Sequence, residues 1–186
     1  KLLEAWLVEK GHRVLVTREP GGTEEGDAVR NLLVSGKGQW DGLAEAMLVS
    51  AARRHHWTKV IAPALDAGKI VLCDRFSDST LAYQGAGRGV AQEQLDCLLK
   101  LATGGHKPDL TIILSLDPRE GLNRAANRRG LENRFEKESL QFHRKIHAEY
   151  LKIANHDPLR CQLVDAAQSI ETIAATIQKI IVEKIL

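Results

Sequence analysis

Aromatic side chains and an excess of either charge are both scarce in this 186-residue sequence. Phe, Trp and Tyr make up 4% of the residues, and 26 basic residues against 24 acidic ones leave a net charge of +2. A nucleic-acid-binding surface usually shows a basic excess interleaved with aromatic rings, and attraction to an acidic membrane needs positive charge. The composition therefore argues against nucleic acid and membrane as partners. Any anion must be held by local clusters of side chains.

Cysteines and long apolar runs are also few. Cys73, Cys97 and Cys161 lie far apart in apolar stretches without the spacing of a metal site, so we interpret them as reduced core thiols of a cytoplasmic protein. No apolar run approaches the ~18 residues that span a bilayer. The GxGxxG motif is absent, and no spacing indicates a Ser–His–Asp or Cys–His group. The length fits one domain covering residues 1–186.

The first residues read as the middle of a structural element. "KLLEAWLVEKG" lacks an initiator Met and has apolar residues at helical spacing, but nothing caps its start. This pattern suggests that residues precede Lys1 in the natural protein. The family resemblance described below leads us to expect a segment of roughly 20 residues there.

Short apolar runs alternate with helical patterns along the rest of the chain. Strands are predicted near residues 13–17, 69–73, 109–117 and 160–166. Helices are predicted near 24–35, 43–67 with a bend or division at Pro63, 91–104, 118–130, 136–155 and 169–186. This alternation predicts an α/β fold with a parallel sheet covered by helices on both faces. In such sheets, ligands bind at the carboxyl ends of the strands.

Charged residues directly follow two of these predicted strands. Asp74 has the position of a carboxylate that helps to hold the hydrated Mg²⁺ of a nucleotide, and Arg75 beside it suits an anion clamp. Arg18 and Glu19 begin the turn "TREPGGT" after the first strand, where Glu19 could reach the same metal or phosphate. From the residues alone, a helix-capping Asp and ordinary ion pairs remain open.

Arginines on the predicted helices form the other candidate sites. Arg30 could be solvated or could point into the cleft, and one of Arg53 and Arg54 must face inward. The adjacent His55 and His56 lack the spacing of a metal-binding pair. A solvated helix face, a nucleic-acid contact and a mobile phosphate-binding lid at about 121–136 all remain open for the cluster of Arg124, Arg128, Arg129 and Arg134.

Four stretches together resemble bacterial thymidylate kinase over essentially the whole chain: "TREPGGT", "DRFSDSTLAYQGAGRG", "HKPDLTIILSLD" and "ENRFEKESLQFHRKIHAEYL". The resemblance implies a three-layer α/β fold of the P-loop nucleoside monophosphate kinase type, with strand order 2-3-1-4-5. Strand 1 and the Gly-rich phosphate loop are missing from this chain, so we expect the 186 residues alone to be inactive. The implied reaction transfers the γ-phosphoryl group of ATP to dTMP, giving dTDP, with Mg²⁺, in a cytoplasmic homodimer.

The resemblance also assigns roles by matching position. It places at dTMP the residues Arg18, Arg30, Val49, Arg53, Arg75, Thr80, Tyr83 and Gln84. It assigns catalysis to Arg75, Asp74, Glu19, Arg128 and Arg129, with Asp74 and Glu19 at Mg²⁺, directly or through water. It places at ATP, or in the lid, Arg124, Arg128, Arg129, Arg134, Ala166, Ala167 and Gln168.

Within the dTMP set, the resemblance gives the phosphate to Arg75 and Arg30 and a thymine carbonyl to Arg53. Thr80 and Gln84 would read the base edge, and the ring of Tyr83 would exclude a ribose. Val49 departs from the family, which has a Phe there that stacks on thymine. Two alternatives stay open: a kinase for another nucleoside or deoxynucleoside monophosphate, and a non-catalytic nucleotide-binding protein without the phosphate loop.

Overall fold

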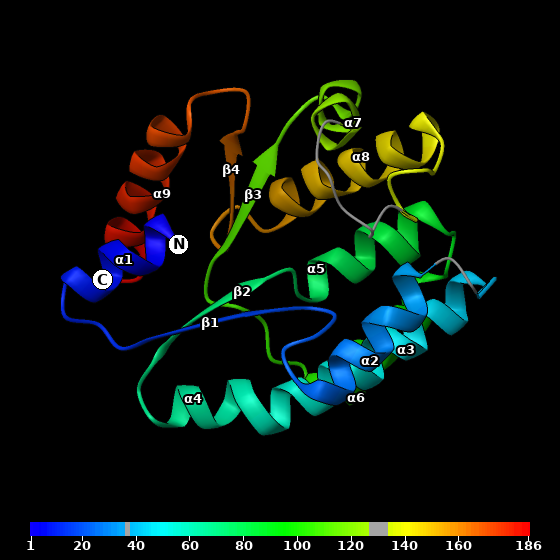
Figure 1. Cartoon of the computed structure of the whole chain (residues 1–186), viewed down its shortest axis with the longest axis horizontal. Coiled ribbons are helices and arrows are strands. Elements are labelled where there is room, and N and C mark those ends of the chain that lie inside the picture. Colours follow the sequence, from blue (N-terminus) through cyan, green and yellow to red (C-terminus); the bar gives the residue numbers. More distant parts are fainter. Residues whose placement is uncertain (36–37, 127–133) are drawn as a thin grey trace.

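The computed structural model describes residues 1–35, 38–126 and 134–186. Its four strands form two parallel pairs (Figure 1). In the first pair, β1 (Val14–Arg18) runs beside β2 (Ile70–Asp74); in the second, β3 (Thr111–Ser115) runs beside β4 (Cys161–Asp165). All four are rich in Val, Ile and Leu, as expected of parallel strands covered on their faces. The predicted α/β class is confirmed, and the predicted strands lie within a residue or two of those observed.

Helices cover the second pair on both sides (Figure 1). On one side lies α8 (Leu140–His156), and on the other lie α9 (Ile170–Lys184) and α1 (Leu2–Glu9). Ser139 caps α8 and Ser169 caps α9, each by accepting a hydrogen bond from a backbone N–H of the first turn. Ile113 of β3 packs with Ile153 and Ala154 of α8 in a buried cluster, which fixes the helix on the strand.

Three further long helices lie to the lower right of the first pair in the view of Figure 1: α2 (Glu24–Val34), α3 (Gly42–His56) and α6 (Gln92–Thr103). After α3 the chain continues through a wide helical turn, Trp57–Ile61, into α4 (Ala62–Asp66). Pro63 lies at the start of α4, where its missing N–H is tolerated. The α-helical pattern predicted over 43–67 is therefore interrupted at 57–61 and not at Pro63, which lies inside α4.

Residues 76–89 contain helical structure where no helix is predicted from the sequence. The short helix α5 (Ser77–Thr80) is followed by a wide helical segment, Leu81–Gly87. Its glycines permit close packing. A Cβ on Gly87 would lie 2.7 Å from a ring carbon of Phe142, and a Cβ on Gly85 would lie 3.0 Å from a methyl carbon of Leu95.

The Arg-rich stretch begins in α7 (Pro118–Ala126), which follows β3. Arg128 and Arg129 lie outside the residues that the structure describes, as do residues 127–133 of the predicted lid at 121–136. Among the described residues, no helix combines the length and the apolar character needed to cross a bilayer.

Candidate active site

The carboxyl ends of β1 and β2 lie side by side. Their parallel register places Arg18 opposite Asp74, and the backbone N–H of Glu19 donates to the carbonyl of Asp74 at 2.9 Å. The two predicted charged turns therefore meet at one edge of the strand pair. Such an edge is where α/β sheets usually bind ligands.

Arg53 extends from α3 into this edge. Its side chain is 2% exposed, whereas Arg54 is exposed, which confirms that one of the two arginines faces inward. Nε of Arg53 donates to Oε2 of Glu19 at 2.6 Å, and Nη1 donates to Oγ1 of Thr80 at 3.0 Å. The guanidinium carbon lies 5.3 Å from the centre of the Phe76 ring. Arg53 is thus held on three sides.

Glu19 is as buried as Arg53. Its second carboxylate oxygen, Oε1, lies 3.0 Å from Nδ1 of His56. Both oxygens are therefore committed to protein donors, and the side chain is 2% exposed. This geometry favours a positioning role for Glu19 over direct coordination of a metal ion.

Asp74 and Arg75 lie on the open side of the same edge. Both are exposed, and within the described ranges the Asp74 carboxylate has no hydrogen-bond or ion-pair partner. Asp74 therefore fits a group that approaches from outside, such as a hydrated Mg²⁺, because hard cations prefer oxygen ligands. Of the two predicted metal-site residues, the donor chemistry of Asp74 fits and the bonded state of Glu19 does not.

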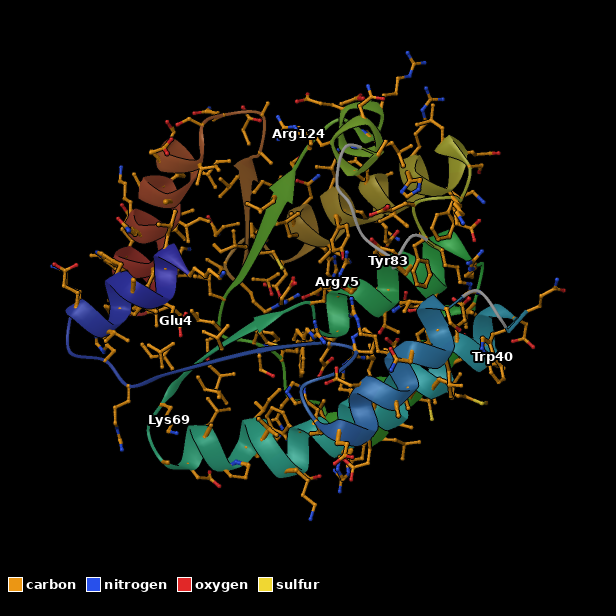
Figure 2. The ribbon with its side chains drawn as sticks, viewed as in Figure 1. Glu4, Trp40, Lys69, Arg75, Tyr83 and Arg124 are labelled. Atoms are coloured by element: carbon orange, nitrogen blue, oxygen red, sulfur yellow. The ribbon has the colours of Figure 1, made fainter. Side chains whose placement is uncertain are left out.

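Arg75 has a left-handed backbone, with φ of 68°. Its guanidinium carbon lies 4.9 Å from the centre of the Tyr83 ring (Figure 2). Desolvation lowers the pKa of Arg75, but the hydroxyl groups of Tyr83 and Tyr150 and the carboxylate of Asp74 offset it, so the net pKa lies above its ordinary value. Arg75 is therefore a permanent cation beside an aromatic ring, and a guanidinium group suits the binding of phosphate.

Gln84 and Val49 are two further predicted dTMP-site residues, and both are buried. Gln84 is 4% exposed and donates through Nε2 to Glu45 at 3.4 Å, and Val49 is 8% exposed on the same face of α3 as Arg53. Glu45 is fully buried and also pairs with Arg88 and Arg134. Sequence reasoning missed Glu45, although its spacing of four residues from Val49 and eight from Arg53 puts it on that face.

The other predicted phosphate ligands have protein partners at the rim. Arg18 forms an exposed ion pair with Asp27 at 3.1 Å. Nη1 of Arg30 donates to the carbonyl of Pro20 at 3.2 Å, so α2 is tied to the turn that follows β1. This contact holds the Arg30 side chain next to Pro20, one residue after Glu19.

The predicted ATP-side residues fall into two places. Nη1 of Arg124 on α7 donates to the carbonyl of Ala166 at 2.8 Å, and Ala167 and Gln168 follow in the same turn after β4. Figure 2 shows Arg124 beyond the end of β3, away from Arg75. Arg134 lies elsewhere, donating to the carbonyl of Leu33 at 2.8 Å and pairing with Glu45. The structure brings Arg124 and Ala166 together but not Arg134.

Comparison with known proteins decides the family. A family model described as thymidylate kinase matches residues 1–177. The chain belongs to the thymidylate kinase family. It is 48% identical over 172 residues to the thymidylate kinase of Magnetococcus marinus, covering 92% of this chain and 82% of that one. It is 44% identical over 180 residues to that of Caulobacter vibrioides, covering 96% and 86%. The resemblance inferred from the motifs is confirmed.

A solved structure agrees with the family assignment. The crystal structure of thymidylate kinase from Ehrlichia chaffeensis superimposes with a TM-score of 0.77 at 33% sequence identity. The match covers 96% of this chain and 88% of that one. The fold is therefore the α/β nucleoside monophosphate kinase fold of this family.

Proposed function

We propose that the protein transfers the γ-phosphoryl group of ATP to dTMP, giving dTDP. Membership of the thymidylate kinase family supports this activity. The structural observation that carries it is the meeting of Arg75, Arg53 and Thr80 at one strand edge, with Arg53 bonded to Thr80 at 3.0 Å. A fixed guanidinium beside a hydroxyl group suits a base edge, and the exposed Arg75 suits the phosphate.

The roles within this site follow from where each group lies. Arg75 would bind the dTMP phosphate and hold it in line with the incoming phosphoryl group, with Arg30 at the same rim. Arg53, Thr80 and Gln84 would bind the base. Transfer would need no covalent enzyme intermediate, because positioning and charge neutralisation supply the catalysis. Mg²⁺, when bound with ATP, would neutralise phosphate charge, and Asp74 is the residue that would hold it.

Arg124 and the turn at Ala166–Gln168 would bind ATP. Their contact at 2.8 Å supports one shared nucleotide surface at the carboxyl ends of β3 and β4. Arg128 and Arg129 keep their predicted roles in neutralising the transferring phosphoryl group. Arg134 would join the lid only after leaving Glu45.

We further propose that the two strand pairs belong to one five-stranded sheet. A strand from outside these 186 residues would run between β2 and β3 and would carry the phosphate loop. When that strand is counted as strand 1, β1 to β4 become strands 2 to 5 and the order across the sheet is 2-3-1-4-5. The split into two parallel pairs supports this arrangement, and so does Leu114, which is 55% exposed in β3. A structure of the complete natural protein tests it, because β2 and β3 would each then pair with that strand.

Family resemblance also supports a homodimer. An apolar face on α3 and α6 supplies a candidate contact, with Met47 52% exposed and Leu101 68% exposed. Sedimentation at micromolar concentration should give the mass of two chains. Leu101→Glu should give a monomer, whereas Val182→Glu, on the exposed side of α9, should not. A wild-type monomer would contradict the proposal.

The activity is tested by a coupled assay of ADP formation with the complete natural protein. We expect turnover with dTMP as phosphate acceptor to exceed that with dUMP, dCMP and UMP. Stacking on a base contributes about 1–3 kcal/mol, so Val49→Phe should lower KM for dTMP. Equal turnover with all four acceptors, or none with any, would contradict the proposed reaction.

A further inference from the structure

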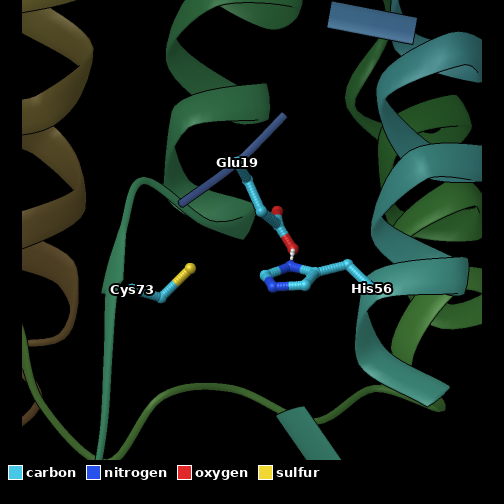
Figure 3. A group of neighbouring side chains, drawn as sticks. All are labelled: Glu19, His56 and Cys73. Atoms are coloured by element: carbon cyan, nitrogen blue, oxygen red, sulfur yellow. Dashed lines mark hydrogen bonds and ion pairs between the residues drawn. The ribbon is translucent and has the colours of Figure 1, made fainter. Parts of the chain in front are cut away.

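His56 is fully buried, and Figure 3 shows one of its ring nitrogens bonded to the Glu19 carboxylate. Nδ1 lies 3.0 Å from Oε1 of Glu19, and Nε2 lies 2.7 Å from Oγ1 of Thr17. A carboxylate can only accept a hydrogen bond, so Nδ1 carries a proton. In the neutral ring, Nε2 then accepts from the Thr17 hydroxyl. The ring is thus fixed between the end of β1 and the carboxylate that follows it.

A chain of hydrogen bonds leads from this ring to Arg53. Glu19 accepts from His56 at Oε1 and from Nε of Arg53 at Oε2, the second at 2.6 Å. Arg53 in turn donates to Thr80. Desolvating an ion pair costs several kcal/mol per ion, so a pair this deeply buried contributes little net stability. Its geometry is nevertheless well determined, because each of these three hydrogen bonds joins two buried side chains.

The turn after β1 keeps the ring in place. Gly22 has φ of +78°, and a Cβ built on it would lie 2.4 Å from Nε2 of His56 and 2.6 Å from Oγ1 of Thr17. Only a residue without a side chain can lie against the ring here. The Pro-Gly-Gly turn therefore packs directly on the bond between Thr17 and His56.

We propose that His56 is a positioning residue for nucleotide binding. By holding Glu19, it sets the orientation of the Arg53 guanidinium at the base site. This inference rests on the proposed contact between Arg53 and dTMP. His56 touches neither substrate in this arrangement, so its effect reaches dTMP only through Glu19 and Arg53.

A metal site is the competing interpretation, since ligand atoms of Glu19, His56 and Cys73 all lie within 4.8 Å of one another. Three features favour the hydrogen-bonded network. Nδ1 of His56 holds a proton, Arg53 already pairs with Glu19, and Sγ of Cys73 donates to the carbonyl of Arg75 at 3.1 Å. Burial and the nearby Glu19 also raise the pKa of Cys73, which opposes the thiolate a metal requires.

Steady-state kinetics of the complete natural protein test the proposal. His56→Ala should raise KM for dTMP about tenfold and leave KM for ATP within about twofold, because one hydrogen bond to a charged group is lost. His56→Asn should retain a near-normal KM, because its amide N–H reaches the position of Nδ1. His56→Gln, whose amide lies nearer Nε2, should behave more like His56→Ala. His55→Ala, at the neighbouring half-buried position, is the matched control and should change neither constant.

Each other outcome overturns the inference. Equal KM values for the Asn and Gln variants would show that the hydrogen bond from His56 to Glu19 does not affect dTMP binding. This comparison holds even if His56→Ala fails to fold. If Arg53→Ala leaves KM for dTMP unchanged, the base contact itself is wrong. If it raises KM while every His56 variant is normal, only the His56 link is wrong. Inhibition by micromolar Zn²⁺ that Cys73→Ser abolishes would show a metal site instead.

Discussion

At the scale of single residues, Arg75 combines an unfavourable backbone with an exposed charge. A left-handed conformation costs a residue with a side chain ~1–2 kcal/mol relative to Gly, and Arg75 adopts it with φ of 68°. Strained positions of this kind tend to lie at functional sites. The strain directs the guanidinium over the Tyr83 ring at the strand edge.

Two substitutions separate the strain of Arg75 from its charge. Arg75→Gly and Arg75→Ala should both lower kcat/KM for dTMP at least about a hundredfold, because each removes the phosphate clamp. Arg75→Gly should be more stable than Arg75→Ala by about 1 kcal/mol, because Gly accepts positive φ without strain. Urea unfolding and the coupled assay check the two parts. Near-normal turnover of either variant would contradict the phosphate role.

The cysteines differ in their expected reactivity. Burial and the nearby Glu19 raise the pKa of Cys73, so at pH 8 it stays a thiol. Cys97 on α6 is exposed, so the interpretation of all three cysteines as core thiols is wrong for Cys97. Iodoacetamide at pH 8 should therefore modify Cys97 first and Cys73 only after unfolding in urea. Mass spectrometry of timed samples checks this order. Modification of folded Cys73 at the rate of Cys97 would contradict the buried network.

At the scale of elements, one ion pair connects the two strand pairs. Asp78 in α5, just after β2, accepts from both terminal nitrogens of Arg160, which precedes β4, at 2.8 and 2.9 Å. The Thr111 hydroxyl at the start of β3 joins them. Asp78 is 5% exposed, so the pair is largely removed from water.

Breaking the Asp78–Arg160 pair should destabilise the folded protein. Asp78→Asn should lower the free energy of unfolding by about 3 kcal/mol, because Arg160 would remain as a half-paired, poorly solvated charge. Asp157→Asn removes a more exposed partner of the same Arg160 and should cost clearly less. Urea denaturation of both variants checks the difference. Equal losses of unfolding free energy in the two variants would contradict the larger stabilising contribution of the Asp78–Arg160 pair.

How well the elements could be predicted depended on how local their signals are. β-branched runs and capping residues such as Ser169 are local, so strands and most helices were found from the sequence. The helical segments at 77–87 were not predicted, because Gly85 and Gly87 there serve close packing against Leu95 and Phe142, which no local pattern shows. The contact of His56 with Glu19 spans 37 positions, so only the fold reveals it. The apolar face of α3 predicted that one of Arg53 and Arg54 points inward, and the structure shows that it is Arg53.

At the scale of the whole molecule, the account depends on which groups meet at the edge of β1 and β2. The family assigns the reaction, whereas the structure shows which side chains are fixed there and which are open. Arg53 and Glu19 are buried and bonded, and Asp74 and Arg75 are exposed. A fixed Arg53 beside an accessible Arg75 fits their proposed roles, in which Arg53 binds the base and Arg75 binds the phosphate of dTMP.

A crystal structure of the complete natural protein with bound dTMP tests this central claim most directly. The account predicts the phosphate within hydrogen-bond distance of the Arg75 guanidinium and a thymine carbonyl at Arg53, with the Glu19 and His56 side chains unmoved. A nucleotide bound elsewhere, with Arg75 and Arg53 turned away from it, would contradict the account.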